Sequence, residues 1–536
     1  MLDQVDNAIL KNMYKSHTSS FINDTWDDFD CAVQNKKLII YGLNALLIFL
    51  QMRSNVKLNI VAAIDNDPNK QNHKLFEFMD ENFLSDSKNI LVSSRDILSD
   101  FNPDEVVIII SSYRYFDEIA DELISYNFRF FFSILNLEYN YRKFMKENKL
   151  GYQNRNEYIS QYVDECILKS PIQKNKIIFL LDDYIDHGKY ITEKLLAENK
   201  NLDIVWSVKN FNVEAPFGVR IVSGGNILKY IYEMETAKIW ISSVITPIYL
   251  KKRTNQIYIQ IKHWGSLTLK SFSLSNSENV NQETFINNGK IMDYIISGSE
   301  FDEETCRKGF NFQGKFLRFG SPRSDILFSK EECRKKIFEL FKLTGGEKIL
   351  LYAPTFRLDK EKNFYDLRWQ NLDFNMLKKT LTEKFGGEWK IFLRLHPQVK
   401  TRSEQIKKPN FVIDVSNYDN SQELVAASDI MISDYSSIIF EFAYVFRPVF
   451  LYAPDKDIYQ LEERKLLIDY DSLPFAISTT NEQLSEQIKS YDEDYYKQRL
   501  KKFLESYGVN EDGHASERCA KFIFKIINEE ENDKNE

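Results

Sequence analysis

The sequence predicts an α/β protein in which two Rossmann-like lobes follow a smaller Rossmann-like domain. Short apolar runs typical of buried strands recur along the chain, and helical patterns separate them. This alternation is typical of parallel sheets. The length of 536 residues exceeds what one hydrophobic core usually holds, so about three domains are expected. We place them at residues 1–150, 151–345 and 346–536.

The first domain, 1–150, is predicted to be Rossmann-like, with a role that its residues leave open. A helix is expected over 115–126. Buried strands are expected over 37–42, 59–67, 105–112 and 128–134. The first strand is followed by the single glycine Gly42 rather than by G-x-G-x-x-G. Asp65 and Asp67 end the second strand, where an acid can bind a ribose. NAD binding, acceptor recognition and a purely structural role all remain open.

The two later domains are each predicted to contain a parallel sheet, after a polar stretch with some helix over 138–175. Strands of the second domain are expected over 176–183, 203–209, 238–243, 256–265 and 293–299. Strands of the third domain are expected over 348–357, 389–397, 411–416, 430–437 and 448–455. Ligands of such sheets bind at the carboxyl ends of the strands. Residues at those ends are therefore the candidates for a site.

Composition and charge argue against several classes of protein. The formal net charge of -9 disfavours nucleic-acid binding, which needs a basic face. The five cysteines are scattered and include no C-x-x-C pair, so neither a disulfide framework nor a zinc site is expected. The first residues lack the features of a signal peptide, and no apolar run approaches the roughly 18 residues of a membrane-spanning helix. We expect a cytoplasmic protein, with peripheral contact to the inner face of the membrane as an open alternative.

The segment 432–448 is the first candidate for phosphate binding. A buried strand ends at Ser433, and an apolar helix is expected to begin near Ser436. Ser436 and Ser437 offer hydroxyls, and the free amides of a helix start attract phosphate. Glu441, about one turn further on, could accept hydrogen bonds from ribose hydroxyls. An ordinary serine N-cap explains the same residues without a ligand.

Two histidines and Arg357 also follow predicted strands, and Arg323 lies in a Gly/Pro turn. His396 precedes a proline at a strand end, and His263 has the same place in the second domain. Such a pair can carry protons near neutral pH. Arg323 lies in the turn GSPRSD and Arg357 in YAPTFR, and arginine forks match phosphate oxygens. Each residue has a plain alternative, which is a histidine packed in a turn or an arginine in a surface salt bridge.

The sequence contains no recognisable metal or P-loop motif. Its six histidines form neither H-x-x-x-H nor H-E-x-x-H, and G-x-x-x-x-G-K-[ST] does not occur. We therefore expect no metal and no cofactor. Arginines and the start of a helix would then balance the negative charge of a bound phosphate.

Taken in order, several motifs resemble the CDP-glycerol glycerophosphotransferase family, the polymerases and primases of teichoic acids and related capsules. They lie within about 176–526 and comprise YIQ-x-x-H, GSPRSD, LYAPTFR, RLHP and ELVAASDIMISDYSSIIFEFA. The resemblance implies a GT-B fold with no metal for the nucleotide, and transfer of a polyol phosphate from a CDP-polyol to a hydroxyl. By the same resemblance, His263 falls on the family's first essential histidine and His396 on the second. Ser436 and Ser437 fall on its phosphate-binding helix start.

Two positions depart from the family pattern. Where the family has H-G-T-P, this chain has His263-Trp264-Gly265-Ser266, on the expected acceptor side of the site. Where the family has aspartate, this chain has Glu441, whose carboxylate reaches about one methylene further. The sequence therefore leaves the acceptor open, as well as the choice between glycerol and ribitol.

The resemblance predicts a phosphotransferase with a CDP-polyol donor and a polymer or lipid-linked acceptor. His263 would take the proton of the acceptor hydroxyl, whose oxygen attacks the polyol-bearing phosphorus, and CMP would leave. Arg323, Arg357 and His396, with the helix start near Ser436, would stabilise the phosphate charge. Two alternatives remain, a GT-B glycosyltransferase that uses a nucleotide sugar and a non-catalytic nucleotide-binding protein. Release of CMP without transfer of a sugar would distinguish the polyol-phosphate transferase from the glycosyltransferase. Ligand binding without turnover would favour the non-catalytic nucleotide-binding protein.

Overall fold

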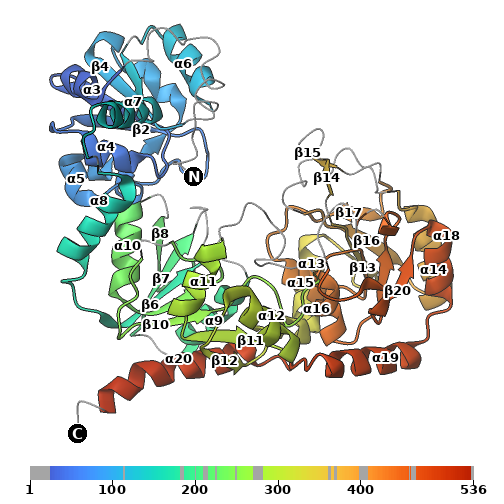
Figure 1. Ribbon diagram of the computed structural model, residues 1–536. Coiled ribbons are helices and arrows are strands. Elements are labelled where there is room, and N and C mark those ends of the chain that lie inside the picture. Colours follow the sequence, from blue (N-terminus) through green and yellow to red (C-terminus); the bar gives the residue numbers. More distant parts are fainter. Residues whose placement is uncertain are drawn as a thin grey trace. The chain divides into compact units, whose positions relative to one another are not determined.

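The protein is an α/β protein with several parallel sheets, and its chain forms two compact units. Unit 1 comprises Met1–Tyr184, Asn201–Trp240 and Pro247–Gln256, and unit 2 comprises Ile185–Lys200, Ile241–Thr246 and Ile257–Glu536 (Figure 1). The computed structural model describes residues 24–112, 115–128, 130–151, 153–181, 186–198, 201–208, 215–223, 226–247, 250–269, 282–355, 357–359, 364–366, 371–396, 408–457, 459 and 466–532. The division into three domains stays a prediction.

A five-stranded parallel sheet occupies the first part of unit 1, in the order β3-β2-β1-β4-β5. Its strands are β1 (Lys37–Tyr41), β2 (Ile60–Ile64), β3 (Val92–Ser93), β4 (Val106–Ile110) and β5 (Phe131–Ser133). Its α-helices are α3 (Trp26–Val33), α4 (Leu47–Arg53), α5 (Glu81–Leu84), α6 (Phe116–Ser125) and α7 (Ile134–Glu147). The strands expected over 37–42, 59–67, 105–112 and 128–134 are all present. Every residue of β4 is buried, as expected for a strand that is covered on both faces.

An open cleft of about 930 Å³ lies at the carboxyl ends of β1, β2 and β4 in this part of unit 1. Gly42, which lines it, turns the chain after β1 with a φ of 88°. Asp65 does not offer a free carboxylate there, because its oxygens accept hydrogen bonds from the amides of Leu43 and Asp67 and from Lys70 Nζ, at 2.8 to 2.9 Å. The ribose-binding role suggested for this strand end stays a prediction for Asp67 alone.

The rest of unit 1 contains strands that pair in the order β9-β6-β7-β8. They are β6 (Gln173–Leu180), β7 (Asp203–Val208), β8 (Val219–Ser223) and β9 (Ala237–Ser242), the last of which begins in unit 1. The stretch 138–175 contains most of α7, and also α8 (Arg155–Tyr162), so its predicted helix is present. Helix α10 (Ile227–Thr236) is capped by the buried Asn226, which also donates hydrogen bonds to the carbonyls of Phe76 and Met79 at 2.8 Å. The first 150 residues are therefore tied to α10 within unit 1.

Unit 2 contains a six-stranded parallel sheet, three further parallel strands and a two-stranded ribbon. The six strands run in the order β17-β16-β13-β18-β19-β20 and are β13 (Lys348–Ala353), β16 (Trp389–Leu393), β17 (Val412–Asp414), β18 (Ile430–Ser433), β19 (Val449–Tyr452) and β20 (Ala476–Ser478). The three further strands pair in the order β12-β11-β10 and are β10 (Ile257–Gln260), β11 (Tyr294–Ser297) and β12 (Lys315–Arg318). The ribbon is antiparallel and comprises β14 (Arg357–Asp359) and β15 (Phe364–Asp366). Each strand predicted for the third domain has a counterpart here.

Helices of unit 2 pack around these strands. They include α9 (His187–Glu198), α11 (Gln282–Ile291), α12 (Glu300–Phe310), α13 (Lys330–Leu340), α14 (Phe374–Phe385), α15 (Ser421–Ala427), α16 (Ile438–Tyr444), α18 (Asn481–Lys489), α19 (Glu493–Ser506) and α20 (Ala515–Asn532). One hydrophobic core of this unit joins Leu267 and Leu269, which follow β10, to Phe440 and Tyr444 of α16. The loop after β10 is therefore held against α16.

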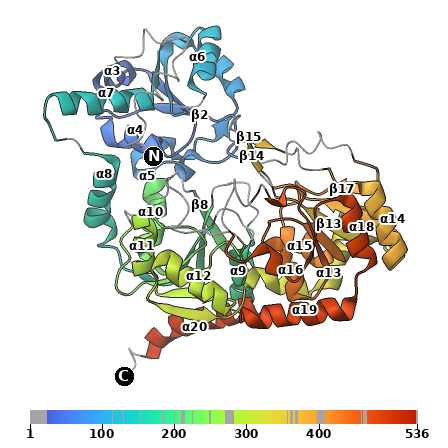
Figure 2. The same cartoon turned by 45° about the vertical axis from the view of Figure 1, so that its right-hand side comes forward.

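The last two helices carry the chain from one part of unit 2 to the other. In both views α20 follows α19, which runs along the six-stranded sheet (Figures 1 and 2). Figure 1 shows α20 passing β12. The ring of Phe522 in α20 packs edge-on against Tyr294 and Phe319, with centroids 5.0 and 5.9 Å apart. Helix α20 also contacts α9 and the 3-10 segment Pro322–Phe328. The connection between α19 and α20 thus lies next to the loops that carry the predicted site.

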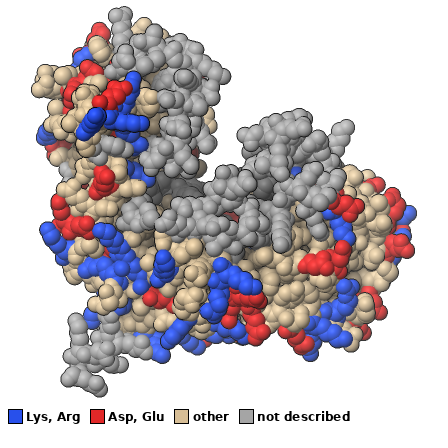
Figure 3. All heavy atoms as spheres, viewed as in Figure 1, with Lys and Arg blue, Asp and Glu red and all other residues tan. Residues whose placement is uncertain are grey.

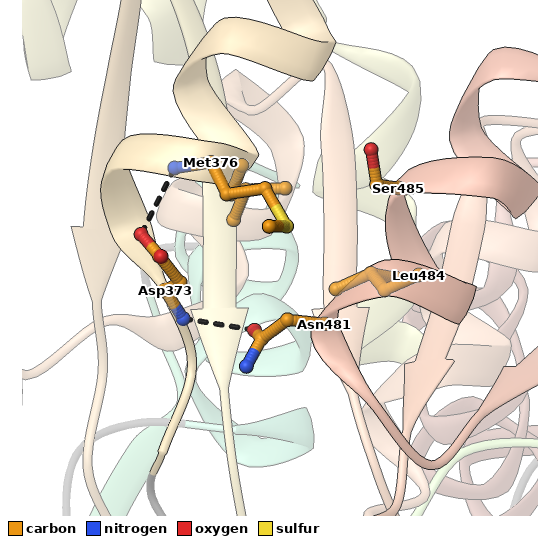
Figure 4. Close-up of a pocket in the computed structure, with 6 residues that line it drawn as sticks. Asp373, Met376, Asn481, Leu484 and Ser485 are labelled. Atoms are coloured by element: carbon orange, nitrogen blue, oxygen red, sulfur yellow. Dashed lines mark hydrogen bonds between the residues drawn. The ribbon is translucent and has the colours of Figure 1, made fainter.

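Two surface features of the described residues are unremarkable for ligand binding. A small pocket of about 10 Å³ lies between α14 and α18, and its polar atoms serve local hydrogen bonds, from Asp373 N to Asn481 Oδ1 and from Met376 N to Asp373 Oδ1 (Figure 4). That volume accommodates about one water molecule. Basic and acidic side chains are interspersed on the face seen in Figure 3. No helix in the described stretches is long and apolar enough to cross a membrane.

Candidate active site

His263 lies in the loop after β10, between two residues that one carboxylate anchors. Lys262 Nζ forms an ion pair with Asp302 in the first turn of α12, and Trp264 Nε1 donates a hydrogen bond to the same carboxylate at 3.0 Å. Lys262, Trp264 and Asp302 are buried, whereas His263 is exposed. Lys262 has a φ of 60°, a backbone conformation that few non-glycine residues adopt. This turn and its anchor hold His263 at the surface of unit 2.

Arg323 forms a partly buried ionic cluster next to this loop, in which Glu441 is the fully buried member. Its guanidinium contacts Asp186 Oδ1 at 3.0 Å and Glu441 Oε1 at 2.8 Å. It also donates a hydrogen bond to the carbonyl oxygen of His263 at 3.2 Å. Arg323 thus links the His263 loop to α16, which carries Glu441, and to Asp186, which immediately precedes α9.

The charges in this cluster depend on one another. Burial opposes the charge of Asp186, but Arg323, His187 and His263 together hold the pKa of its carboxyl below the usual value. Burial also opposes the charge of Arg323, and the two carboxylates keep its pKa above the usual value. For Glu441 burial outweighs the effect of Arg323, so its pKa is raised. The negative charge of Asp186 therefore acts on His263, whereas Glu441 is the carboxyl that takes up a proton more readily.

His187 is a second histidine in this region, and it is fully buried. Its Nε2 donates to the carbonyl of Trp264 at 3.0 Å, which assigns the ring proton to that nitrogen. Within the described part of the chain, His187 Nδ1 and Arg323 Nε are buried atoms that have no hydrogen-bond partner. Such atoms are uncommon and mark places where a ligand or water can bind. Sequence reasoning missed both Asp186 and His187, which lie directly before and at the start of α9.

We predict that His187 makes the protein less stable in acid. Burial lowers the pKa of His187 from 6.5 to about 4. Between these values the unfolded histidine binds a proton that the folded one does not, so stability is present above pH 6.5 and is lost as the pH falls towards 4. The His187→Gln variant keeps a side-chain donor for Trp264 but cannot titrate. Its thermal midpoint should fall less than that of the wild type between pH 6.5 and 4.5, and parallel curves would contradict the prediction.

Arg357, predicted to bind phosphate, has protein partners in this structure. It forms a two-point ion pair with Asp455 at 2.7 and 3.1 Å and contacts Asp434 at 3.0 Å. Its guanidinium also lies over the rings of Tyr435 and Tyr459, 5.0 and 4.6 Å from their centroids. Arg357 thus holds the turn between β18 and α16 in place, and its phosphate-binding role stays a prediction.

The two serines of that turn differ in their surroundings. Ser437 Oγ accepts a hydrogen bond from the amide of Leu269 at 3.0 Å and lies 3.2 Å from Thr268 Oγ1. Ser436 Oγ accepts only a long bond, 3.5 Å, from the amide of Ile438, among the described contacts. The serine N-cap alternative does not apply to Ser437, whose side chain caps no amide of α16. Phosphate binding by these serines stays a prediction, with Ser436 the less engaged of the two.

His396 is exposed and lies just after β16, as the sequence predicted. The two residues before it are fixed, because Arg394 donates to the carbonyls of Val415 and Tyr418, and the amide of Leu395 donates to Ser416 Oγ. The next residues, 397–407, lie outside the described residues. A shared site for His396 and His263 stays a prediction.

Fold and site together define an α/β protein of parallel sheets, with an exposed histidine beside a partly buried arginine–carboxylate cluster. Residues 163–525 match the family model described as CDP-Glycerol:Poly(glycerophosphate) glycerophosphotransferase. This match covers more than half of the chain and includes every predicted site residue. The chain therefore belongs to this family, as its motifs predicted.

Relatives with curated descriptions have teichoic acid functions. The chain is 30% identical over 370 residues to a teichoic acid poly(glycerol phosphate) polymerase of Staphylococcus epidermidis, with 65% of this chain and 50% of the relative covered. It is 29% identical over 361 residues to a teichoic acid glycerol-phosphate transferase of Staphylococcus aureus, with 64% and 90% covered. A poly(ribitol-phosphate) polymerase of Bacillus spizizenii is 26% identical over 364 residues, with 65% and 56% covered. The chain spans about half the length of the two polymerases that head this group.

Solved structures of a teichoic acid polymerase are also similar to this chain. The structure of the wall teichoic acid polymerase TagF aligns with a TM-score of 0.62 and 27% identity, and the alignment covers 73% of this chain and 98% of that one. A histidine-to-asparagine variant of TagF soaked with CDPG aligns with a TM-score of 0.59 over the same shares. The described α/β fold is thus similar to that of TagF.

Proposed function

We propose that this protein transfers a polyol phosphate, of glycerol or ribitol, from a CDP-polyol to a hydroxyl of a growing polymer of the teichoic acid or capsule type. The observation that carries the proposal is the family match over 163–525, within which an exposed His263 lies beside the Arg323 cluster. The names of the relatives and the CDPG soak of TagF support the same donor.

In the proposed reaction, His263 is the general base. It takes the proton of the acceptor hydroxyl as that oxygen forms a bond to the polyol-bearing phosphorus, and the bond from this phosphorus to the oxygen of CMP breaks. The negative charge of Asp186 favours the imidazolium that forms, as a carboxylate does beside a catalytic histidine. Arg323 keeps Asp186 charged and holds the His263 backbone.

Donor binding is proposed for the third predicted domain, 346–536. Ser436 and His396 would contact the pyrophosphate, and Arg357 would act by fixing the turn that carries Ser436. Residues 151–345 and 346–536 would form the two lobes of a GT-B fold. The first 150 residues lie outside the family match, and we propose for them a role outside the chemistry. A cytoplasmic protein with its acceptor at the inner face of the membrane fits this activity.

When a panel of donors is tested, we expect only a CDP-polyol to be used, with release of CMP. Purified protein would be incubated with CDP-glycerol, CDP-ribitol and a set of nucleotide sugars, each with and without a polymer primer, and the nucleotide products would be separated by chromatography. Release of CMP together with growth of the primer by polyol phosphate supports the proposal. Transfer of a sugar would instead identify a glycosyltransferase, and tight binding without product would identify a binding protein.

A further inference from the structure

The connection between α19 and α20, residues 507–514, packs on the loops that carry His263 and Arg323. The amide of Asn510 donates to the carbonyl of Gly298 at 2.8 Å. At the start of α20 the amides of Ala515 and Ser516 donate to Asp325, two residues after Arg323, at 2.9 and 2.7 Å. This connection is therefore fixed at both ends, and Glu511 lies between the two contacts.

Glu511 joins the two loops through one carboxyl group. Its Oε1 accepts a hydrogen bond from Ser266 Oγ, three residues after His263, and its Oε2 accepts one from the amide of Ser321 at 3.1 Å. The two serine hydroxyls lie 3.2 Å apart, and both serines are buried. Ser266 is one of the three positions after His263 at which this chain departs from the H-G-T-P of its family. The carboxyl and the two hydroxyls thus form one closed hydrogen-bonded group.

This group has no spare room around it. A Cβ atom on Gly298 would lie 1.6 Å from Ser266 Oγ and 2.9 Å from Glu511 Oε1, so only glycine fits at that position. Ser299 Oγ also donates to the carbonyl of Ser266 at 2.5 Å. A change in the position or protonation of the Glu511 carboxyl therefore shifts the backbones of Ser266 and Ser321, because closely packed groups leave no room for a purely local adjustment.

We propose that Glu511 is a positioning residue that, through Ser266 and Ser321, sets the approach of the His263 loop to Arg323. The proposal rests on the proposed function for its effect on transfer. Glu511 touches neither substrate nor the reacting atoms. Its effect passes through two short chain segments, from Ser266 back to His263 and from Ser321 forward to Arg323, whose guanidinium binds the His263 carbonyl.

The protonation state of Glu511 supports this role and gives it a pH dependence. Burial raises the pKa of Glu511 to about 8, while the hydrogen bonds from Ser266 and Ser321 work in the opposite direction. The charged or titratable groups that act on it are Asp325, whose negative charge raises the pKa further, and the Tyr444 hydroxyl of α16. No cation pairs with Glu511 among the described residues. At pH 7 the carboxyl is therefore mostly uncharged.

Ionisation above pH 8 would place an unpaired negative charge beside two buried hydroxyls. The hydrogen bonds from Ser266 Oγ and the Ser321 amide then end on a charged acceptor and shorten, so the two loops shift relative to each other. A shift of the His263 loop by a fraction of an ångström to 1 Å is enough to lower transfer roughly tenfold to a hundredfold. Wild-type activity should therefore fall on the alkaline side with an apparent pKa near 8.

The kinetic test compares Glu511→Gln, Glu511→Ala and the neighbouring control Asp512→Asn in the full chain. Glutamine imitates the uncharged carboxyl, so E511Q should match the wild type at pH 7 and keep its activity to a higher pH. E511A should lower kcat at every pH, with little change in KM for CDP-glycerol. Asp512 is exposed and pairs with Arg518, so D512N should follow the wild-type profile. A wild-type pH profile for E511Q, or full activity of E511A with only a lower thermal midpoint, would overturn the proposal.

A second measurement is independent of turnover. In protein labelled with ¹³C-histidine, the His263 ring signal of the wild type should show a transition near pH 8, which should vanish in E511Q and persist in D512N. The signal is assigned as the one absent from His263→Gln. If no CDP-polyol is turned over but this transition behaves as stated, the proposed function fails while the positioning role stands. A His263 signal that is the same in E511Q and the wild type would remove the positioning role itself.

Discussion

The His263→Ala variant is expected to lower turnover of the CDP-polyol about 100-fold or more, with donor affinity nearly unchanged. The proposed partner of His263 is the acceptor hydroxyl, so its loss removes a proton acceptor but no contact to the donor. His263 is exposed, and both its neighbours are anchored to Asp302, so the loop should keep its shape without the ring. The measurements are kcat, donor affinity by calorimetry and the thermal midpoint.

Two further histidine variants make this result specific. His396→Ala should also lower turnover, but together with weaker donor binding, because its proposed partner is the pyrophosphate. His73→Ala is the matched control, since this partly exposed histidine pairs with Glu77 in unit 1, outside the family match. It should leave all three measurements unchanged. A well-folded His263→Ala protein with full activity would remove the general-base role and leave phosphate electrostatics as the source of catalysis.

The Asp302→Ala variant is expected to lower the free energy of unfolding by about 3–5 kcal/mol. Asp302 and Lys262 are both fully buried, and the substitution leaves the ammonium of Lys262 without its carboxylate. It also removes the acceptor of the Trp264 indole N–H. Urea denaturation monitored by circular dichroism measures the loss.

A double variant separates the cost of the stranded charge from the loss of packing. Lys262→Met combined with Asp302→Ala leaves no buried charge, so it should be clearly more stable than Asp302→Ala alone, as replaced buried ion pairs often are. The exposed pair of Lys308 and Glu304 on the same helix serves as the control, and Glu304→Ala should change stability by less than about 1 kcal/mol. Loss of less than 1 kcal/mol in Asp302→Ala would show that the pair does not hold the His263 loop.

Most strands with a continuous apolar run were predictable from the sequence, even short ones such as β5 and β17, whereas some half-exposed strands were missed. Runs such as Val106–Ile110 and Lys348–Ala353 are continuous and apolar because helices cover both faces of a parallel sheet. By contrast, β12 (Lys315–Arg318) has charged residues at both ends and no buried position, so it carries no such signal. Its place comes from pairing with β11.

The predicted site residues were found where strands end, but their partners were not. His263, Arg323 and Glu441 lie in local patterns that can be recognised one at a time. Arg323 connects all three, and its further partner Asp186 lies far from them in the sequence. Glu511 was missed for the same reason, since nothing in residues 507–514 shows that a carboxyl there meets two buried hydroxyls.

The role of a predicted residue was harder to infer than its position. Arg357 has the residue type and location of a phosphate ligand, yet in this structure two carboxylates occupy its guanidinium. The phosphate-binding role of Arg357 stays a prediction. Its contacts could not be predicted, because both carboxylates lie far from it in the sequence. The same holds for Asp65, whose oxygens tie the end of β2 to the loop after β1.

The hydrogen bond between Ser266 and Glu511 joins positions 245 residues apart. A ribosome releases the chain from its N-terminal end at roughly 5–20 residues per second, and contacts so distant in sequence form late in folding. The His263 loop is therefore synthesised well before the carboxyl that completes its surroundings. Until residue 511 has emerged, the nascent chain can fold its sheets but leaves the two serine hydroxyls to water. The hydrogen-bonded group beside the His263 loop is thus completed only after residue 511 has left the ribosome.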